Sequence, residues 1–187
     1  MSALLDIANL EPDQLAPSRP PSLPSAIPTA QRVRIVNGIQ TDVLVQSFAD
    51  RILVLVTQLG RIGCMIQVSP PPPTLPSSLP PPGATISSSL LPGLPPPHPS
   101  TVLTPLFGVP PTPHVSALHD LYASQIGAIV FRKFALEAAG GGAKPVVLGI
   151  GLKSSTAGKE EDEEGGVSEE ERGTFKEIME MVLECIG

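Results

Sequence analysis

Aromatic side chains, cysteines and long apolar runs are scarce in this 187-residue chain. It has no tryptophan and only 3% aromatic residues, which removes the stacking platforms that single-stranded nucleic acids use. Two cysteines, Cys64 and Cys185, are too few for a disulfide framework. No apolar run reaches the roughly 18 residues of a membrane span, and Asp6 and Glu11 interrupt any signal-peptide pattern. We therefore expect a soluble cytoplasmic protein, with access to the nucleus, that has reduced thiols and binds neither nucleic acid nor membrane.

Charge and proline are concentrated in separate segments. The net charge is −6, and the eight acidic and two basic residues of segment 154–173 account for all of it, so the remainder is neutral. Of the 24 prolines, 13 lie in residues 70–99, a density that a central strand cannot hold because proline lacks the ladder donor. We expect a disordered tail at 1–31 and one domain at 32–187, which is interrupted by a proline-rich insertion at 69–100 and an acidic linker at 154–173.

The middle of the chain predicts consecutive antiparallel strands at residues 41–48, 51–58 and 64–68. Ala49-Asp50 has the length of a tight hairpin connection, and Gly60 and Gly63 bracket a second turn. Asn37-Gly38 is a strong hairpin signal after another strand at 32–37. Further strands are expected at 101–107, where Pro105 limits the strand to a sheet edge, and at 145–152.

Two helices complete an expected α+β fold with an antiparallel sheet of about six strands. The first covers residues 114–138, with Thr112 as N-cap, Pro113 in the first turn and one apolar stripe. The second begins at Thr174, where Thr174 and Glu177 have the spacing of a capping box, and carries a clean apolar face to Ile186.

Two of the expected strands are apolar on both faces. Residues 52–56 are five consecutive branched apolar residues, whereas a strand with one wet face would alternate apolar and polar residues. Helices of the same chain can cover one face, and the other face needs a second sheet, which a partner can supply. Leu53, Leu55 and Val147 are therefore candidate partner contacts, with burial inside one monomer as the alternative.

The turn after the second of these strands is a further candidate contact. Leu59, Gly60 and Arg61 project from it and can reach a client protein, and a purely structural turn is the alternative.

The sequence contains few residue patterns typical of an active site or a metal site. His114 and His119 lie five apart, not the three or four that place two ligands on one helix face, and we expect them to be solvated. Ser116, His119 and Asp120 are neighbours on one helix and cannot reproduce a catalytic triad. We expect an interaction domain with no catalytic residue, cofactor or metal, and a small hydrolase remains only a remote alternative.

The central strands resemble those of the proteasome assembly chaperone 3 family. The resemblance lies in Thr41-Asp42-Val43, in Ser47-Phe48 and in the run 51–63, RILVLVTQLGRIG, where an apolar strand is followed by Thr-Gln, a large apolar residue, Gly, a basic residue, an apolar residue and Gly. It covers residues 33–68, 101–153 and 174–186. The tail and both insertions lie outside it and are of a kind expected in a fungal member.

This resemblance implies a non-catalytic chaperone for assembly of the proteasome core particle. It implies a small α+β fold, no cofactor, and a heterodimer with the related fourth proteasome assembly chaperone. The pair is expected to bind proteasome α-subunits early, to help order the α-ring and to leave before the particle is complete.

A trafficking scaffold or adaptor of the longin or roadblock type is the alternative from another class. Its proline-rich loop would be a ligand for proline-recognising domains, since Pro70 and Pro73 have the nominal spacing. However, no Lys or Arg lies between Ile62 and Phe131 to orient such a ligand.

Overall fold

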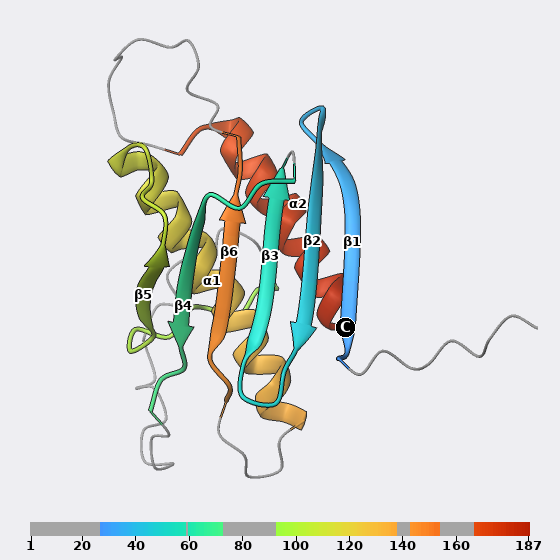
Figure 1. Cartoon of the computed structure of the whole chain (residues 1–187), viewed down its shortest axis with the longest axis vertical. Coiled ribbons are helices and arrows are strands. Elements are labelled where there is room, and N and C mark those ends of the chain that lie inside the picture. Colours follow the sequence, from blue (N-terminus) through green and yellow to red (C-terminus); the bar gives the residue numbers. More distant parts are fainter. Residues whose placement is uncertain (1–26, 59, 73–92, 138–142, 154–166) are drawn as a thin grey trace, which may run out of the picture.

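The structure is a computed structural model that describes residues 27–58, 60–72, 93–137, 143–153 and 167–187 (Figure 1). It contains six strands and two helices, which confirms the predicted α+β class. The elements are, in chain order, β1 (Thr29–Val36), β2 (Ile39–Ser47), β3 (Ile52–Gln58), β4 (Cys64–Ser69), β5 (Val102–Phe107), α1 (Pro113–Glu137), β6 (Val146–Gly151) and α2 (Glu169–Ile186).

The strands form one sheet in the order β1-β2-β3-β6-β4-β5. The predicted meander is correct for β1, β2 and β3, which pair antiparallel, but wrong for β4. The late strand β6 lies between β3 and β4, parallel to the first and antiparallel to the second. Five of its six residues are buried, and a strand that is apolar on both faces is most stable at the centre of a sheet.

The ends of the sheet follow local turn and edge chemistry. Asn37 and Gly38 both have positive φ, 50° and 76°, as the Asn-Gly hairpin signal predicts. β1 begins at Thr29, three residues before the expected Arg32, because Thr29 and Ala30 already pair with Gln46 and Val45. The edge position predicted for the strand with Pro105 is confirmed in β5.

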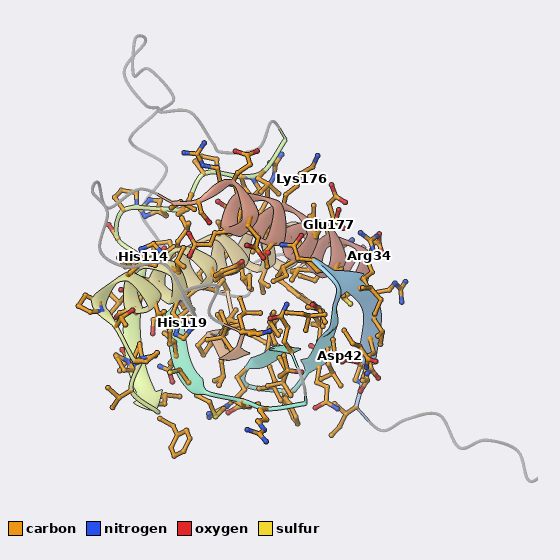
Figure 2. All side chains as sticks on the ribbon, turned by 90° about the horizontal axis from the view of Figure 1, so that it is seen from above. Arg34, Asp42, His114, His119, Lys176 and Glu177 are labelled. Atoms are coloured by element: carbon orange, nitrogen blue, oxygen red, sulfur yellow. The ribbon has the colours of Figure 1, made fainter. Side chains whose placement is uncertain are left out.

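Both helices lie on the same face of the sheet, with α2 over β1 and β2 and α1 over β4, β5 and β6 (Figures 1 and 2). The core fills the space between these two layers. Its largest fully buried side chains include Ile52, Ile126, Leu148, Ile150, Ile178, Met179 and Met181. Gly127 lets α1 approach β4 closely, since a Cβ at this position would lie 2.7 Å from Val68 Cγ1.

The first turn of α1 confirms the predicted N-cap, and the middle of this helix binds the end of the proline-rich segment. Val115 N donates to Thr112 Oγ1 at 3.2 Å, so Thr112 caps the helix as expected. Gln125 Nε2 donates to the carbonyl oxygen of Pro95 at 2.8 Å, and Leu94 packs against the core. The described end of the proline-rich segment is therefore attached to the fold and does not stand outside it.

The predicted start of the last helix is wrong by five residues. The capping box is made by Ser168 and Glu171: Glu171 N donates to Ser168 Oγ at 3.2 Å, and Ser168 N donates to Glu171 Oε2 at 2.8 Å. Thr174 lies within the helix and donates to the carbonyl oxygen of Glu170. Acidic residues in the first turn complement the helix dipole, so residues 169–173 begin α2 and do not belong to the expected linker.

Replacing Ser168 should destabilise the domain more than replacing Thr174. We expect Ser168→Ala to lower the free energy of unfolding by about 1 kcal/mol, because it removes the acceptor for an otherwise unpaired N–H. Thr174→Ala is the matched control and should change it by less than about half of that, since its hydroxyl donates to a carbonyl that the helix already satisfies. The hydroxyl also accepts from Asn37 Nδ2 at 2.8 Å, but this bond is exposed and water can replace it. Urea denaturation of both variants measures the difference, and equal effects would contradict this assignment of the cap.

The two arginines of β1 face α2. Arg34 lies beside Glu177 (Figure 2), at 3.0 Å. It also contacts Glu180 at 3.5 Å and pairs with Glu184, while Arg32 lies 3.4 Å from Glu184. Exposed pairs of this kind contribute little stability singly. Their partners on α2 show that both cations of this strand are on the helix side of the sheet, the side on which Val36 is buried.

Candidate interaction surface

The sheet has a second face that no described helix covers, which we call the open face. In β3, Ile52, Val54 and Val56 are fully buried under the helices, whereas the alternate residues Leu53 and Leu55 are only half-buried. The same alternation runs through β2 and β4. The apolar residues of the open face are Val33, Ile35, Leu44, Leu53, Leu55, Met65, Val102, Phe107 and Val147.

Three of the predicted contact residues lie together at the centre of this face. Leu53 is in register with Val147, and Leu55 is in register with both Leu44 and Gly149. A Cβ at Gly149 would lie 2.6 Å from Leu55 Cδ2 and 3.3 Å from Ile62 Cγ2, so both side chains lie over this glycine. Neighbours thus cover Val147 down to 5% exposure, but they leave the leucines partly open to solvent.

The edge strands extend the apolar surface to both sides. Val33 and Ile35 on β1 are exposed, the second by 68%, and Val102 and Phe107 on β5 are exposed, the second by 66%. These four residues were not singled out from the sequence, although the alternation Val33-Arg34-Ile35 is a detectable signal for two apolar residues on one face. An apolar surface that spans the whole sheet is typical of a protein–protein contact.

The described part of the turn between β3 and β4 packs against the end of β6. Gly60 has a φ of +66°, Gly63 N donates to the carbonyl oxygen of Ile150 at 3.0 Å, and a side chain at Gly151 would collide with the backbone of Arg61. Gly60 and Arg61 are both exposed, and Leu59 lies outside the described residues. The turn adds Ile62 to the open face, a residue that was not predicted.

Gln58 explains part of the Thr-Gln motif that precedes this turn. Its side chain is buried on the helix side, where Nε2 donates to Thr41 Oγ1 at 3.0 Å. Its Oε1 accepts from the backbone N–H of Lys153 at 2.8 Å. This glutamine ties β2, β3 and the end of β6 together, and its buried polar atoms are paired, as stability requires.

A cavity of about 170 Å³ lies where the N-terminal ends of α1 and α2 meet the end of β6. Its polar lining includes His119, Tyr122, Lys153 and Glu171. His119 is only 6% exposed, so the prediction of a solvated histidine is wrong. It falls on the same helix face as Val115 and Tyr122, which turns it toward the core.

Two of the ionisable groups that line this cavity, His119 and Glu171, have shifted pKa values. Burial lowers the pKa of His119, although Asp120 opposes the shift. Burial raises the pKa of Glu171, but hydrogen bonds from His114 and from Ser168 more than offset this and lower it overall. His114 Nε2 lies 2.8 Å from Glu171 Oε1, so it too has a partner. Within the described ranges, no three His, Cys, Asp or Glu residues are grouped to hold a metal ion.

Protonation of His119 should destabilise the fold in mild acid. Because its pKa is lowered on folding, the unfolded chain binds the proton at higher pH, and stability is lost as the pH falls below about 6.5. We expect His119→Phe to flatten the fall in melting temperature between pH 7 and pH 5. Tyr122→Phe on the same helix face is the control: burial raises the pKa of the Tyr122 hydroxyl, so this group carries no charge in that range and its removal should leave the slope unchanged. A slope that His119→Phe does not alter would contradict this assignment.

Comparison with models of protein families and with curated proteins finds no match to this chain. Within its described segments, neither helix is long and apolar enough to span a bilayer.

Proposed function

We propose that this chain is a non-catalytic assembly chaperone of the proteasome core particle. In this role it forms a heterodimer with the fourth proteasome assembly chaperone, and the pair binds α-subunits to promote formation of the α-ring. The proposal joins the sequence resemblance of residues 51–63 to the one structural observation that supports it best, the apolar open face.

The open face supports the proposal of a partner because apolar side chains on this side of the sheet remain partly exposed to water, and another protein can bury them. The helices provide this on one side only, with every core residue of β3 buried there. On the other side Leu44, Leu53 and Leu55 remain partly solvated. Burying apolar surface stabilises by roughly 25 cal/mol per Å², so a second sheet laid on this face would gain binding energy across its whole width.

An assembly chaperone also needs a surface that binds and later releases. The exposed turn with Gly60 and Arg61 lies at one end of the open face and remains the proposed α-subunit contact. The described end of the turn is held in place, because Gly63 N donates to the carbonyl oxygen of Ile150 and Gly151 lies against the backbone of Arg61.

Co-expression of the full chain with the fourth assembly chaperone and individual α-subunits tests this function. Native mass spectrometry should show a 1:1 heterodimer that retains an α-subunit. A chain that stays monomeric in the presence of both the fourth assembly chaperone and the α-subunits would overturn the proposal. Loss of its main partner on deletion of residues 70–99 would instead indicate an adaptor that works through its proline-rich loop.

A further inference from the structure

Charged residues are nearly absent from the sheet. Within the six strands, which are all described, the charged side chains are Arg32, Arg34 and Asp42. The two arginines point to the glutamates of α2. Asp42 is therefore the one charge that the strands contribute to the open face.

Asp42 belongs to the open face by register and by contact. It pairs with Val33 on β1 and Thr57 on β3, while the preceding residue, Thr41, is fully buried on the helix side. In Figure 2, Arg34 lies beside Glu177, whereas Asp42 lies away from α2. Gln40 Nε2 donates to its carboxylate at 3.1 Å, and among the described residues Asp42 has no ion pair.

Any partner that covers Leu44 and Leu55 at the centre of the open face must also cover Asp42. The carboxylate lies two residues from Leu44 on the same strand, and Val33 flanks it on the outer side. Removing an ionised carboxylate from water without a counter-charge is strongly unfavourable. The occupant must therefore supply a cation at this point, or the gain from apolar burial is largely lost.

We propose that the open face binds a different protein whose own apolar surface carries a Lys or Arg that pairs with Asp42. This inference rests on the proposed use of the open face in the chaperone heterodimer and specifies the partner's chemistry. Electrostatic complementarity of this kind selects partners more than it adds affinity.

A second copy of this chain does not fit the same requirement. The strands offer no cation on the open face, so in a symmetric pair the facing strands of the other copy would leave each Asp42 without a counter-charge. The exposed Arg61 lies outside the strands, in the turn at one end of this face. Asp42 thus acts against self-association and favours the heteromeric complex.

The test compares Asp42→Asn and Asp42→Lys with the wild-type chain. Affinity for the purified fourth assembly chaperone is measured by calorimetry, and self-association of the chain alone by analytical ultracentrifugation. Asp120→Asn and Asp120→Lys are matched controls, because Asp120 is exposed on α1, on the other side of the molecule.

We expect Asp42→Asn to weaken the heteromeric complex about 30-fold or more, since it leaves the partner's cation buried and unpaired. Asp42→Lys should weaken the complex further. Of the two variants, only Asp42→Asn should increase self-association, because it removes the buried charge without adding another. The Asp120 variants should behave as wild type. Wild-type affinity of both Asp42 variants would overturn the inference. If Leu55→Asp still abolishes that complex, the proposed function stands without the charge pairing, and if it does not, the open face itself fails as the contact.

Discussion

Leu55→Asp should abolish the complex with the fourth assembly chaperone while the domain remains folded. Leu55 lies at the centre of the open face, over Gly149 and opposite Leu44. An aspartate here would keep partial contact with water in the free chain but would be buried without a counter-charge in the complex. A penalty of at least about 3 kcal/mol is expected, which corresponds to a loss of affinity of more than about 100-fold.

Leu183→Asp is the matched control for this prediction. Leu183 lies on α2 and is 42% exposed, so it offers the same residue type at a solvated position outside the open face. It should bind with wild-type affinity. Ile35→Asp, at the well-exposed rim of the open face, should weaken binding by about tenfold without loss of stability. Equal affinities of the Leu55 and Leu183 variants would place the contact elsewhere.

Gly151→Ala should destabilise the domain by about 3 kcal/mol or displace the turn between β3 and β4. A Cβ at this position would collide with the carbonyl oxygen of Arg61, which is backbone and cannot rotate away. Overpacking of a rigid site usually costs about 1 to 3 kcal/mol, and a backbone clash belongs at the upper end of that range. Because the turn carries Ile62 to the open face, partner binding should weaken as well.

Gly173→Ala provides a control with the opposite sign. Gly173 lies inside α2, is exposed, and has open space where a Cβ would be placed. Alanine should therefore stabilise the domain by about 0.5 to 1 kcal/mol through its higher helix propensity. Thermal and urea denaturation measure both variants. A stabilising Gly151→Ala would show that the turn yields easily and would contradict the fixed turn described above.

Local chemistry predicted most of the elements of this fold. Runs of branched apolar residues and turn signals located β1 to β3, the Asn37-Gly38 hairpin and the N-cap Thr112, because each depends on neighbours in sequence. The position of β6 between β3 and β4 depends on pairing between distant segments, and no local pattern specifies it. The start of α2 was missed because Ser168-Glu171 and Thr174-Glu177 have the same capping-box spacing, and the first lies in a run that looks like a solvated linker.

The candidate surface was predictable in part for the same reason. Two-sided apolar strands pointed to Leu53, Leu55 and Val147, which the structure places side by side. The contributions of Ile62 and Phe107 depend on how a turn and an edge strand fold back over the sheet. The isolation of Asp42 appears only when register shows that both arginines of β1 point the other way.

Methyl NMR of the chain with an unlabelled partner tests the central claim most directly. With leucine and valine methyl groups labelled, addition of the fourth assembly chaperone should shift the signals of Leu44, Leu53, Leu55 and Val147. The methyl signals of Leu183 on α2 should stay in place. Shifts confined to the outer surface of the helices, with the open-face signals unchanged, would contradict the account.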